Sequence, residues 1–211
     1  MNEVAEGSRK NYLINSLVKY CHIIAAIIGG SLLFYFLIVP CVAQRALDQD
    51  YFTADDSPQI KLLLESVDLH HTRKAEDWIF KGDMLYVHYA LGELTYTLDT
   101  FPNHPRALQL VGAYSKIKKV PEIAIPFYQK ALRLYPQYAL THVQYGGFLV
   151  DVGRTEEGIV RLKKAIEIDP KLAIAYDGLY KAYTKIGNLE MARKTAEKAK
   201  ELGIKIKEGL K

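Results

Sequence analysis

The sequence predicts an all-α protein, in which one membrane-spanning helix is followed by a right-handed superhelix of short helical hairpins. Two observations predict this fold class: an uncharged apolar run near the N-terminus, and a pattern of apolar and small residues that repeats at a constant spacing in the C-terminal half. The 211 residues leave room for one domain of moderate size besides the apolar run. The formal charge of +4 is too small to indicate nucleic-acid binding by itself.

The apolar run extends from Ile23 to Val39 without a charged residue, and with its flank to residue 43 it is long enough to cross a bilayer. Three cations precede the run and one follows it closely: Arg9, Lys10, Lys19 and Arg45. Cytoplasmic flanks of membrane spans carry the excess of Lys and Arg. We therefore predict a transmembrane anchor over 23–43, a cytoplasmic segment over 1–22, and a translocated domain after the anchor.

Two outcomes stay open for this segment. Either it is retained as a single-pass anchor, or a signal peptidase cuts between Ala43 and Gln44. Cys41 and Ala43 occupy the small-x-small positions of such a site, and Pro40 stands in front of them as a helix breaker. The segment 1–22 before the run is long for the start of a signal peptide, which favours the anchor. Both outcomes place the following domain outside the cytoplasm, in the periplasm of a bacterial cell.

A 34-residue period appears at several independent positions. Prolines recur with this spacing, as do alanines and a third set of small residues: Pro102, Pro136, Pro170; Ala131, Ala165, Ala199; and Ala124, Gly158, Ala192. A proline cannot continue a helix, and the apolar residues between the prolines follow the spacing of two helix faces. One such hairpin cannot bury its apolar stripe alone, so the units must stack on one another.

This period and pattern resemble the tetratricopeptide repeat, a helix-turn-helix unit, and the block "GDMLYVHYALGELTYTLDTFPNHPRAL" is similar to a group of exported bacterial repeat proteins. The signature positions of that repeat are well matched in the second unit, at His142, Tyr145, Gly146, Leu149, Gly158, Leu162 and Ala165. The resemblance implies three units with a cap and a degenerate unit before them. The expected segments are a linker at 44–56, the cap and degenerate unit at 57–104, units at 105–138, 139–172 and 173–205, and a tail at 206–211.

Two residues of the first unit depart from the pattern. Lys119 stands where the resemblance implies a glycine, and Pro126 lies inside the second helix. Because an interior proline costs about 3 kcal/mol, we expect a kink or a late helix start at Pro126. We also expect His104 to brace the turn before this unit. Tyr176, Tyr180 and Tyr183 fall on one helix, and we expect them to pack between units, with contact to a bound peptide as the alternative for some of them.

The resemblance implies that the first helix of each unit lines a concave groove. The groove-facing positions are Arg106, Gln109, Ala113 and Lys116 in the first unit, Leu140, Val143, Gly147 and Val150 in the second, and Ile174, Asp177, Lys181 and Thr184 in the third. The middle set is apolar and small, which suits an extended or helical peptide with an apolar centre. Alternatively, the chain's own terminal segment covers the middle set. The family's clamp for chaperone C-termini wants Lys and Asn where this chain has Gln109 and Ala113, so that clamp is not expected.

The sequence contains no pattern of residues that indicates catalysis, cofactor binding or metal binding. The six histidines include no pair at i and i+4 with a carboxylate beside it. Adjacent His70 and His71 would diverge by about 100° on a helix and could not clamp one metal ion. Neither a GxSxG elbow nor a glycine-rich phosphate loop is present. We expect no enzymatic activity.

The two halves of the translocated part differ in charge. Residues 44–104 contain 5 Lys and Arg against 11 Asp and Glu, whereas residues 105–211 contain 20 against 11. The difference is consistent with ordinary solvated helix faces. It is also consistent with self-association between the acidic part of one copy and the basic part of another, or with an acidic partner or anionic lipid headgroups on the basic part.

Together these features predict a non-enzymatic, membrane-tethered scaffold or assembly factor that binds a protein partner of the cell envelope, with no nucleic-acid partner. The alternative is a permanent accessory subunit of a larger membrane complex, held by the anchor as well as by the repeats.

Overall fold

The computed structural model describes residues 47–81 and 84–206, and every regular element among them is helical. The predicted anchor at 23–43 and its flanks lie outside these residues. Among the described helices, none combines the length and the apolar character that a bilayer crossing requires. The chain divides into two units at Ala46, and the description below concerns the second, Leu47–Lys211.

The first helices of this unit form one continuous helical segment rather than a separate cap. A 3-10 helix, η1 (Tyr51–Asp56), leads into α3 (Pro58–Val67), the π-helical turn η2 (Asp68–Thr72) and α4 (Arg73–Lys81), and these last three follow one another without a break. The cap expected at the start of 57–104 is therefore continuous with the degenerate hairpin. α4 pairs with α5 (Met84–Thr100) as the two helices of that hairpin.

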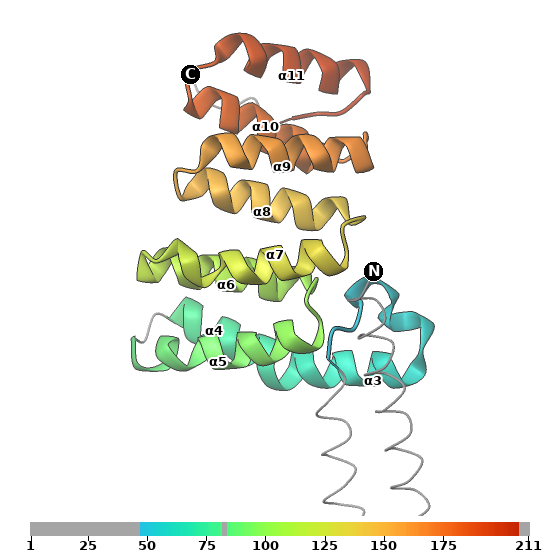
Figure 1. Cartoon of the computed structure of the whole chain (residues 1–211), viewed down its shortest axis with the longest axis vertical. Coiled ribbons are helices and arrows are strands. Elements are labelled where there is room, and N and C mark those ends of the chain that lie inside the picture. The colour runs from blue at the N-terminus through green and yellow to red at the C-terminus, as the bar shows by residue number, and fades with distance from the viewer. Residues whose placement is uncertain (1–46, 82–83, 207–211) are drawn as a thin grey trace, which may run out of the picture. The chain divides into compact units, whose positions relative to one another are not determined.

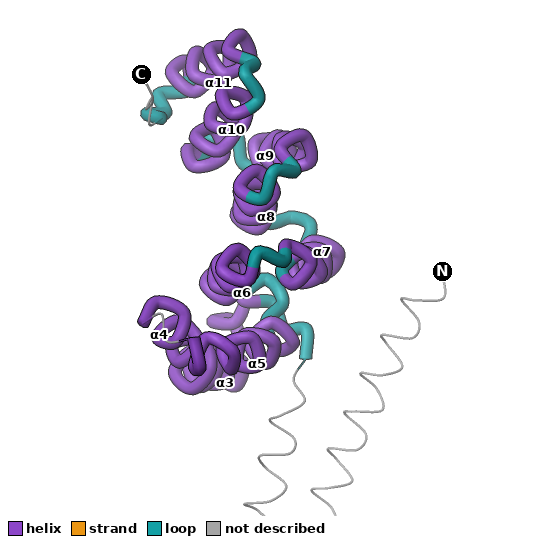
Figure 2. Tube along the Cα trace, turned by 90° about the vertical axis from the view of Figure 1, so that its left-hand side faces the viewer, coloured by secondary structure: helices purple, strands orange, loops and turns teal. Residues whose placement is uncertain are grey.

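Three further hairpins follow, and the starts of their first helices are separated by the period that the sequence predicts. They consist of α6 (Pro105–Lys118) with η3 (Pro121–Ile123) and α7 (Ile125–Leu134), α8 (Ala139–Asp151) with α9 (Thr155–Ile168), and α10 (Ala173–Lys185) with α11 (Leu189–Glu201). The helices succeed one another along the stack from α5 to α11 (Figure 1). Figure 2 shows α6 and α8 on one side of the stack and α7 and α9 on the other.

The turn inside each hairpin has the same backbone conformation. Lys119, Gly153 and Gly187 all have positive φ angles, of 56°, 89° and 74°. In each turn the residue that follows donates its N–H to a carbonyl five residues earlier, as Arg154 does to Leu149. A helix can end with this hydrogen-bond pattern only when a residue in the turn after it has a left-handed backbone conformation. Glycine adopts that conformation with the least strain. Lys119 adopts the same geometry without being a glycine.

The expectation at Pro126 is confirmed as a late helix start. The short helix η3 ends before α7 begins at Ile125, which places Pro126 in the first turn of α7. The backbone N–H that proline lacks would have no partner within the helix there, so the interior penalty is avoided.

Buried apolar residues of the described part pack as one cluster from α4 to α8, a second from α8 to α11, and a small third one around Ala54, Val67 and Phe101. Aromatic residues lie within the first cluster. Tyr128 of α7 stacks on Tyr145 of α8 at a ring distance of 5.1 Å, and its hydroxyl donates to the carbonyl of Leu108 at 2.8 Å. That hydroxyl occupies the space above Gly112, where a Cβ would lie only 2.9 Å from it. Tyr176 and Tyr183 of α10 are also buried, so their expected packing role is confirmed.

Candidate functional site

The predicted groove positions lie on α6, α8 and α10, the first helices of their hairpins. Their exposure differs from helix to helix. Arg106, Gln109, Lys116, Ile174 and Lys181 are exposed, Leu140, Gly147 and Asp177 are half-buried, and Val143 and Val150 are buried.

Val143 and Val150 correct the prediction for the middle of the groove. Each is only 8% exposed, and both belong to the core cluster that contains Leu162 of α9 and Leu179 of α10. The reason is that α8 is an interior helix, packed by neighbours on more than one side. These two valines therefore offer almost no surface to a partner, and they are covered by helices of the repeats themselves.

Gly147 marks an opening in the middle of α8. A Cβ built on this residue would meet no atom within 4 Å, whereas one built on its neighbour Gly146 would lie 2.8 Å from Leu162. The two adjacent glycines therefore have different roles. Gly146 lets α8 and α9 approach, and Gly147 leaves the floor of the predicted groove flat and open.

Ion pairs join the first helices across the units. Arg106 of α6 donates from Nε to Glu76 of α4 at 2.8 Å, and Lys116 of α6 pairs with Asp151 of α8 at 2.6 Å. The guanidinium of Arg106 and the ammonium of Lys116 are therefore already neutralised by neighbouring units. At the α6 end of this face, a partner gains more from apolar contact and hydrogen bonds than from charge.

The described part of the predicted linker packs against the repeats and belongs to their domain. Residues 47–56, which we call the N-terminal strap, lie along the end of α5 and the turns that follow α5 and α7. The strap joins the C-terminal end of α5 through backbone bonds from Asp48 N to Asp99 O at 2.9 Å and from Gln49 N to Thr100 O at 2.7 Å.

Asp50 is the central side chain of the strap. Its carboxylate accepts from the amide of Asn103 at 2.7 Å and from the hydroxyl of Tyr138 at 2.6 Å, so it joins two successive inter-repeat turns. Phe52 packs on the Tyr138 ring at 4.3 Å, and the Tyr135 hydroxyl donates to the carbonyl of Asp48. Burial, with the nearby carboxylates, raises the pKa of Tyr135 to about 12. Sequence reasoning missed this strap because its partners lie far away along the chain, beyond the reach of any local pattern.

Other contacts also cross between the acidic and the basic part of the same chain. Lys130 of α7 pairs with Asp48 at 2.9 Å and with Asp99 at 3.1 Å, and the Arg106–Glu76 pair described above crosses in the same way. Part of the charge complementarity predicted for self-association is thus used within one chain.

His104 braces the turn before α6, as expected. Its Nδ1 accepts the N–H of Ala107 at 3.2 Å, so the imidazole caps the helix. Its Nε2 lies 2.8 Å from the carboxylate of Asp68 in η2. Because Nδ1 accepts this N–H, Nε2 is the ring nitrogen that can donate to the carboxylate. Burial of Asp68 opposes its ionisation, but the hydrogen bonds from His104 and Thr72 and the charge of Arg73 outweigh it, so the pKa of Asp68 is lowered.

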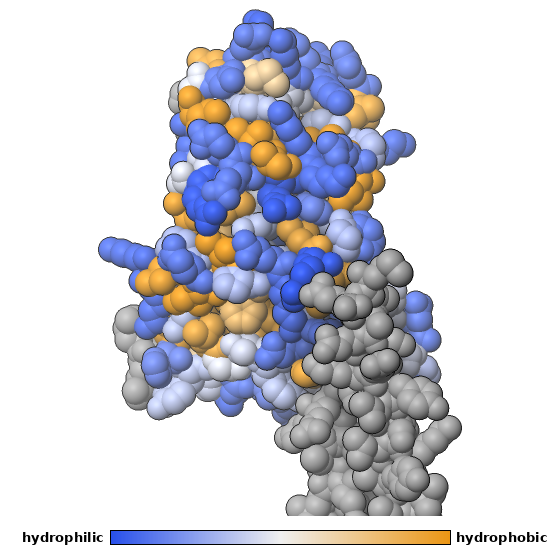
Figure 3. Space-filling view, in the orientation of Figure 1, coloured by the Kyte–Doolittle hydropathy of each residue, from blue (hydrophilic) through white to orange (hydrophobic). Residues whose placement is uncertain are grey.

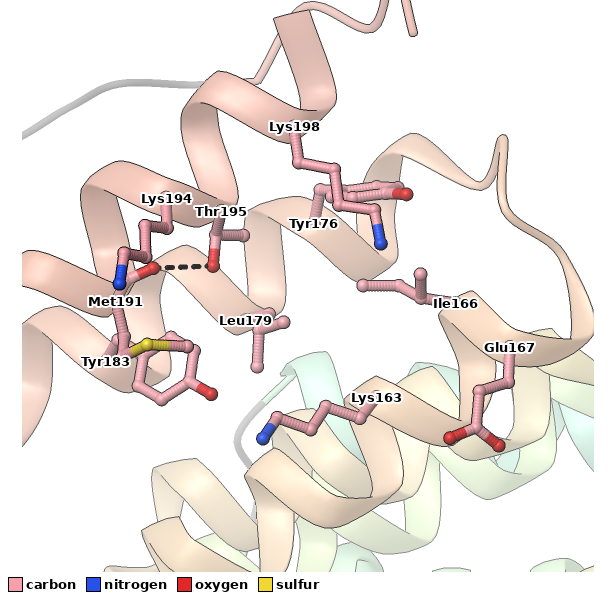
Figure 4. Close-up of a pocket in the computed structure, with 10 residues that line it drawn as sticks. All are labelled: Lys163, Ile166, Glu167, Tyr176, Leu179, Tyr183, Met191, Lys194, Thr195 and Lys198. Atoms are coloured by element: carbon pink, nitrogen blue, oxygen red, sulfur yellow. Dashed lines mark hydrogen bonds between the residues drawn. The ribbon is translucent and has the colours of Figure 1, made fainter. Parts of the chain in front are cut away.

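A hollow that the sequence did not reveal lies between α9, α10 and α11. Its volume is about 330 Å³, and its floor is apolar and aromatic, while lysines stand at its edge. Figure 4 shows the side chains around it: Lys163, Ile166, Glu167, Tyr176, Leu179, Tyr183, Met191, Lys194, Thr195 and Lys198. Figure 3 shows that hydrophobic residues also reach the surface in patches between hydrophilic ones along the stack.

Among the described residues, no three His, Cys, Asp or Glu side chains come together as a metal site. In this part of the chain, the three hairpins from α6 to α11 recur at a constant spacing, and each is closed by a left-handed residue at the same place. This architecture is the one expected from the resemblance. The repeats have the helical-hairpin fold of the tetratricopeptide type.

No protein-family model matches the sequence, and no curated protein matches it. Among solved structures, MamA of AMB-1 is similar at 22% identity, over 69% of this chain and 81% of that chain, with a TM-score of 0.46. YrrB, described as a TPR protein with an unusual peptide-binding site, is similar at 19% identity, over 68% and 73%, with a TM-score of 0.48. The Thermobaculum terrenum O-GlcNAc transferase is similar at 27% identity, over 57% of this chain and 22% of that chain, with a TM-score of 0.43.

Proposed function

We propose that this chain is a non-enzymatic scaffold or assembly factor, which binds a protein partner along the face formed by α6, α8 and α10. Residues 23–43 would tether it to a membrane with the repeats on the extracytoplasmic side. The open position at Gly147 is the observation on which the binding proposal depends, because it leaves room for a partner segment at the centre of this face.

The surroundings of Gly147 suit a peptide with an apolar centre. Leu140 lies two turns before Gly147 on α8. Ile174 on α10 is 45% exposed, which is more than a core residue would be. Exposed polar side chains flank this strip, with Gln109 on α6 and Lys181 on α10. An extended or helical segment could place its apolar side chains over Gly147 and its polar groups along the edges.

A tether would strengthen such binding without any additional contact. Confinement near a membrane raises the effective concentration of the repeats toward partners in the same membrane. The N-terminal strap supports this proposal, since it fixes the point at which the repeats join the preceding chain.

The binding face can be tested with two substitutions at one position. Gly147→Trp would place an indole over the open floor, and Gly147→Ala would add only a methyl group, for which there is open space. Full-length chains purified from membranes in mild detergent would be compared by affinity isolation and quantitative mass spectrometry. We expect recovery of the partner to fall at least tenfold with Gly147→Trp and to persist with Gly147→Ala. Equal recovery with both variants would remove this face from consideration.

The same isolation separates the two forms of the proposal. A permanent subunit should comigrate with its complex at a fixed stoichiometry, whereas an assembly factor should be recovered in amounts that vary with synthesis of its client. The N-terminus of the isolated chain reports whether cleavage occurs after Ala43. Protease treatment of intact and of permeabilised cells tests the topology. If the repeats are digested only when the protease can reach the cytoplasm, the proposed orientation is overturned.

A further inference from the structure

The hollow between α9, α10 and α11 combines an apolar floor with unopposed positive charge. Leu179 and Tyr183 of α10 form its floor, together with Ile166 of α9 and Met191 of α11. Helices α9 and α11 both pack against α10 and leave this space between them (Figure 4). A volume of about 330 Å³ is enough for one large apolar side chain and the backbone around it.

The charges at the edge do not cancel. Glu167 is paired with Lys164 at 3.0 Å, and Lys194 is paired with Glu190 at 2.6 Å. These two pairs leave the ammonium groups of two other lysines at the edge, Lys163 and Lys198. Neither forms an ion pair with a carboxylate of the described residues, and Lys163 lies over the ring of Tyr183 at 5.9 Å.

From this arrangement we infer that the hollow is a second protein-binding site, which takes an acidic segment carrying one large apolar side chain. The apolar side chain would fill the floor over Leu179 and Tyr183. Carboxylates on either side of it would pair with Lys163 on α9 and Lys198 on α11. This inference rests on the proposed interaction function, but it uses none of the residues near Gly147.

The chain's own tail is a poor occupant. The sequence after Gly203 carries three lysines and one glutamate, so it has the same sign of charge as the edge of the hollow. A partner segment of opposite charge matches both the apolar floor and the ammonium groups of Lys163 and Lys198, which have no ion pair among the described residues.

The test uses a fluorescein-labelled, capped peptide in which two glutamates flank a phenylalanine on each side. Full-length chain in detergent micelles would be titrated, with binding followed by fluorescence anisotropy. We expect Lys198→Glu to weaken binding at least fivefold. Lys200→Glu is the matched control, since Lys200 is exposed on the same helix and does not line the hollow; it should change the affinity less than twofold. Gly147→Trp should leave peptide binding unchanged, so failure of the concave-face proposal and failure of this one can be told apart.

Two changes in the peptide and one in the solvent complete the test. Glutamine in place of the glutamates, or alanine in place of the phenylalanine, should each weaken binding at least fivefold, and raising the salt from about 50 to about 300 mM should weaken it severalfold. Equal binding of the glutamine peptide, or equal effects of Lys198→Glu and Lys200→Glu, would overturn the inference. Displacement of the peptide by phosphatidylglycerol vesicles, but not by phosphatidylcholine vesicles, would assign the hollow to anionic lipid and overturn it as well.

Discussion

The carbonyl oxygen of Gly146 lies 2.7 Å from the position that a Cβ on Gly158 would occupy. Helices α8 and α9 cross at this point, backbone against backbone. The small residue at the position of Gly158 recurs in the neighbouring units as Ala124 and Ala192, which are also buried. This close approach thus occurs at a position where the sequence keeps side chains small.

The first prediction concerns this crossing. Gly158→Ala should lower the free energy of unfolding by about 1 to 2 kcal/mol, because the overlap outweighs the gain in helix propensity. Gly147→Ala is the matched control in an open helical position and should raise it by about 0.5 to 1 kcal/mol. Urea unfolding of the full-length chain in micelles, followed by circular dichroism, measures both. If the two variants shift the transition in the same direction, the close approach of α8 and α9 does not restrict the size of the side chain at residue 158.

The second prediction concerns the turn at Lys119. A non-glycine residue in the left-handed region carries a strain of about 1 kcal/mol, which Lys119→Gly relieves. Part of this gain is offset by the greater freedom of glycine in the unfolded chain. We expect a net stabilisation of up to about 1 kcal/mol by thermal unfolding. Lys118→Gly, in the last turn of α6, should instead destabilise the protein, and a loss of stability in both variants would contradict the argument.

The third prediction concerns acid. Burial of Glu93 opposes its ionisation, but hydrogen bonds from Lys74 and His71 and their charges outweigh it, so the folded pKa lies below the ordinary value of 4.5. A carboxylate whose pKa is lowered on folding contributes stability above its unfolded pKa and loses it as the pH falls through the folded pKa. Glu93→Gln should therefore cost about 1 kcal/mol at neutral pH. The difference from the wild type should shrink as the pH falls below about 4.5, and a pH-independent difference in urea midpoints would count against the charge-based account.

The fourth prediction concerns the N-terminal strap. Asp50→Ala removes the acceptor shared by Asn103 and Tyr138, which we expect to cost about 2 kcal/mol of local stability. The amides of Asp48, Gln49 and Tyr51 should then exchange with deuterium roughly 30-fold faster, while those of α8 and α9 keep their protection. Asp56→Ala changes an exposed carboxylate of the same segment and serves as the control. Unchanged exchange in Asp50→Ala would mean that the backbone bonds alone hold the strap.

The recurring elements were readable from the sequence because each follows from local chemistry. Prolines end hairpins, glycines close turns, and Pro126 indicates a kink or a late helix start, of which the structure has the late start. The burial of Val143 and Val150 was not readable in this way. A position that faces solvent in an isolated hairpin is buried when neighbouring units pack against it, and spacing along one helix does not record how many neighbours it has.

The sequence by itself determined the helical repeat, its period and the first residues of α6, α8 and α10, since those depend on backbone preferences and on apolar spacing within a few turns. The tertiary structure alone decided which groove residues remain open, how the strap reaches Asn103 and Tyr138, and where two lysines border an apolar hollow. Each of these depends on pairs of residues far apart in the chain, and their distances are set by how one hairpin packs on the next.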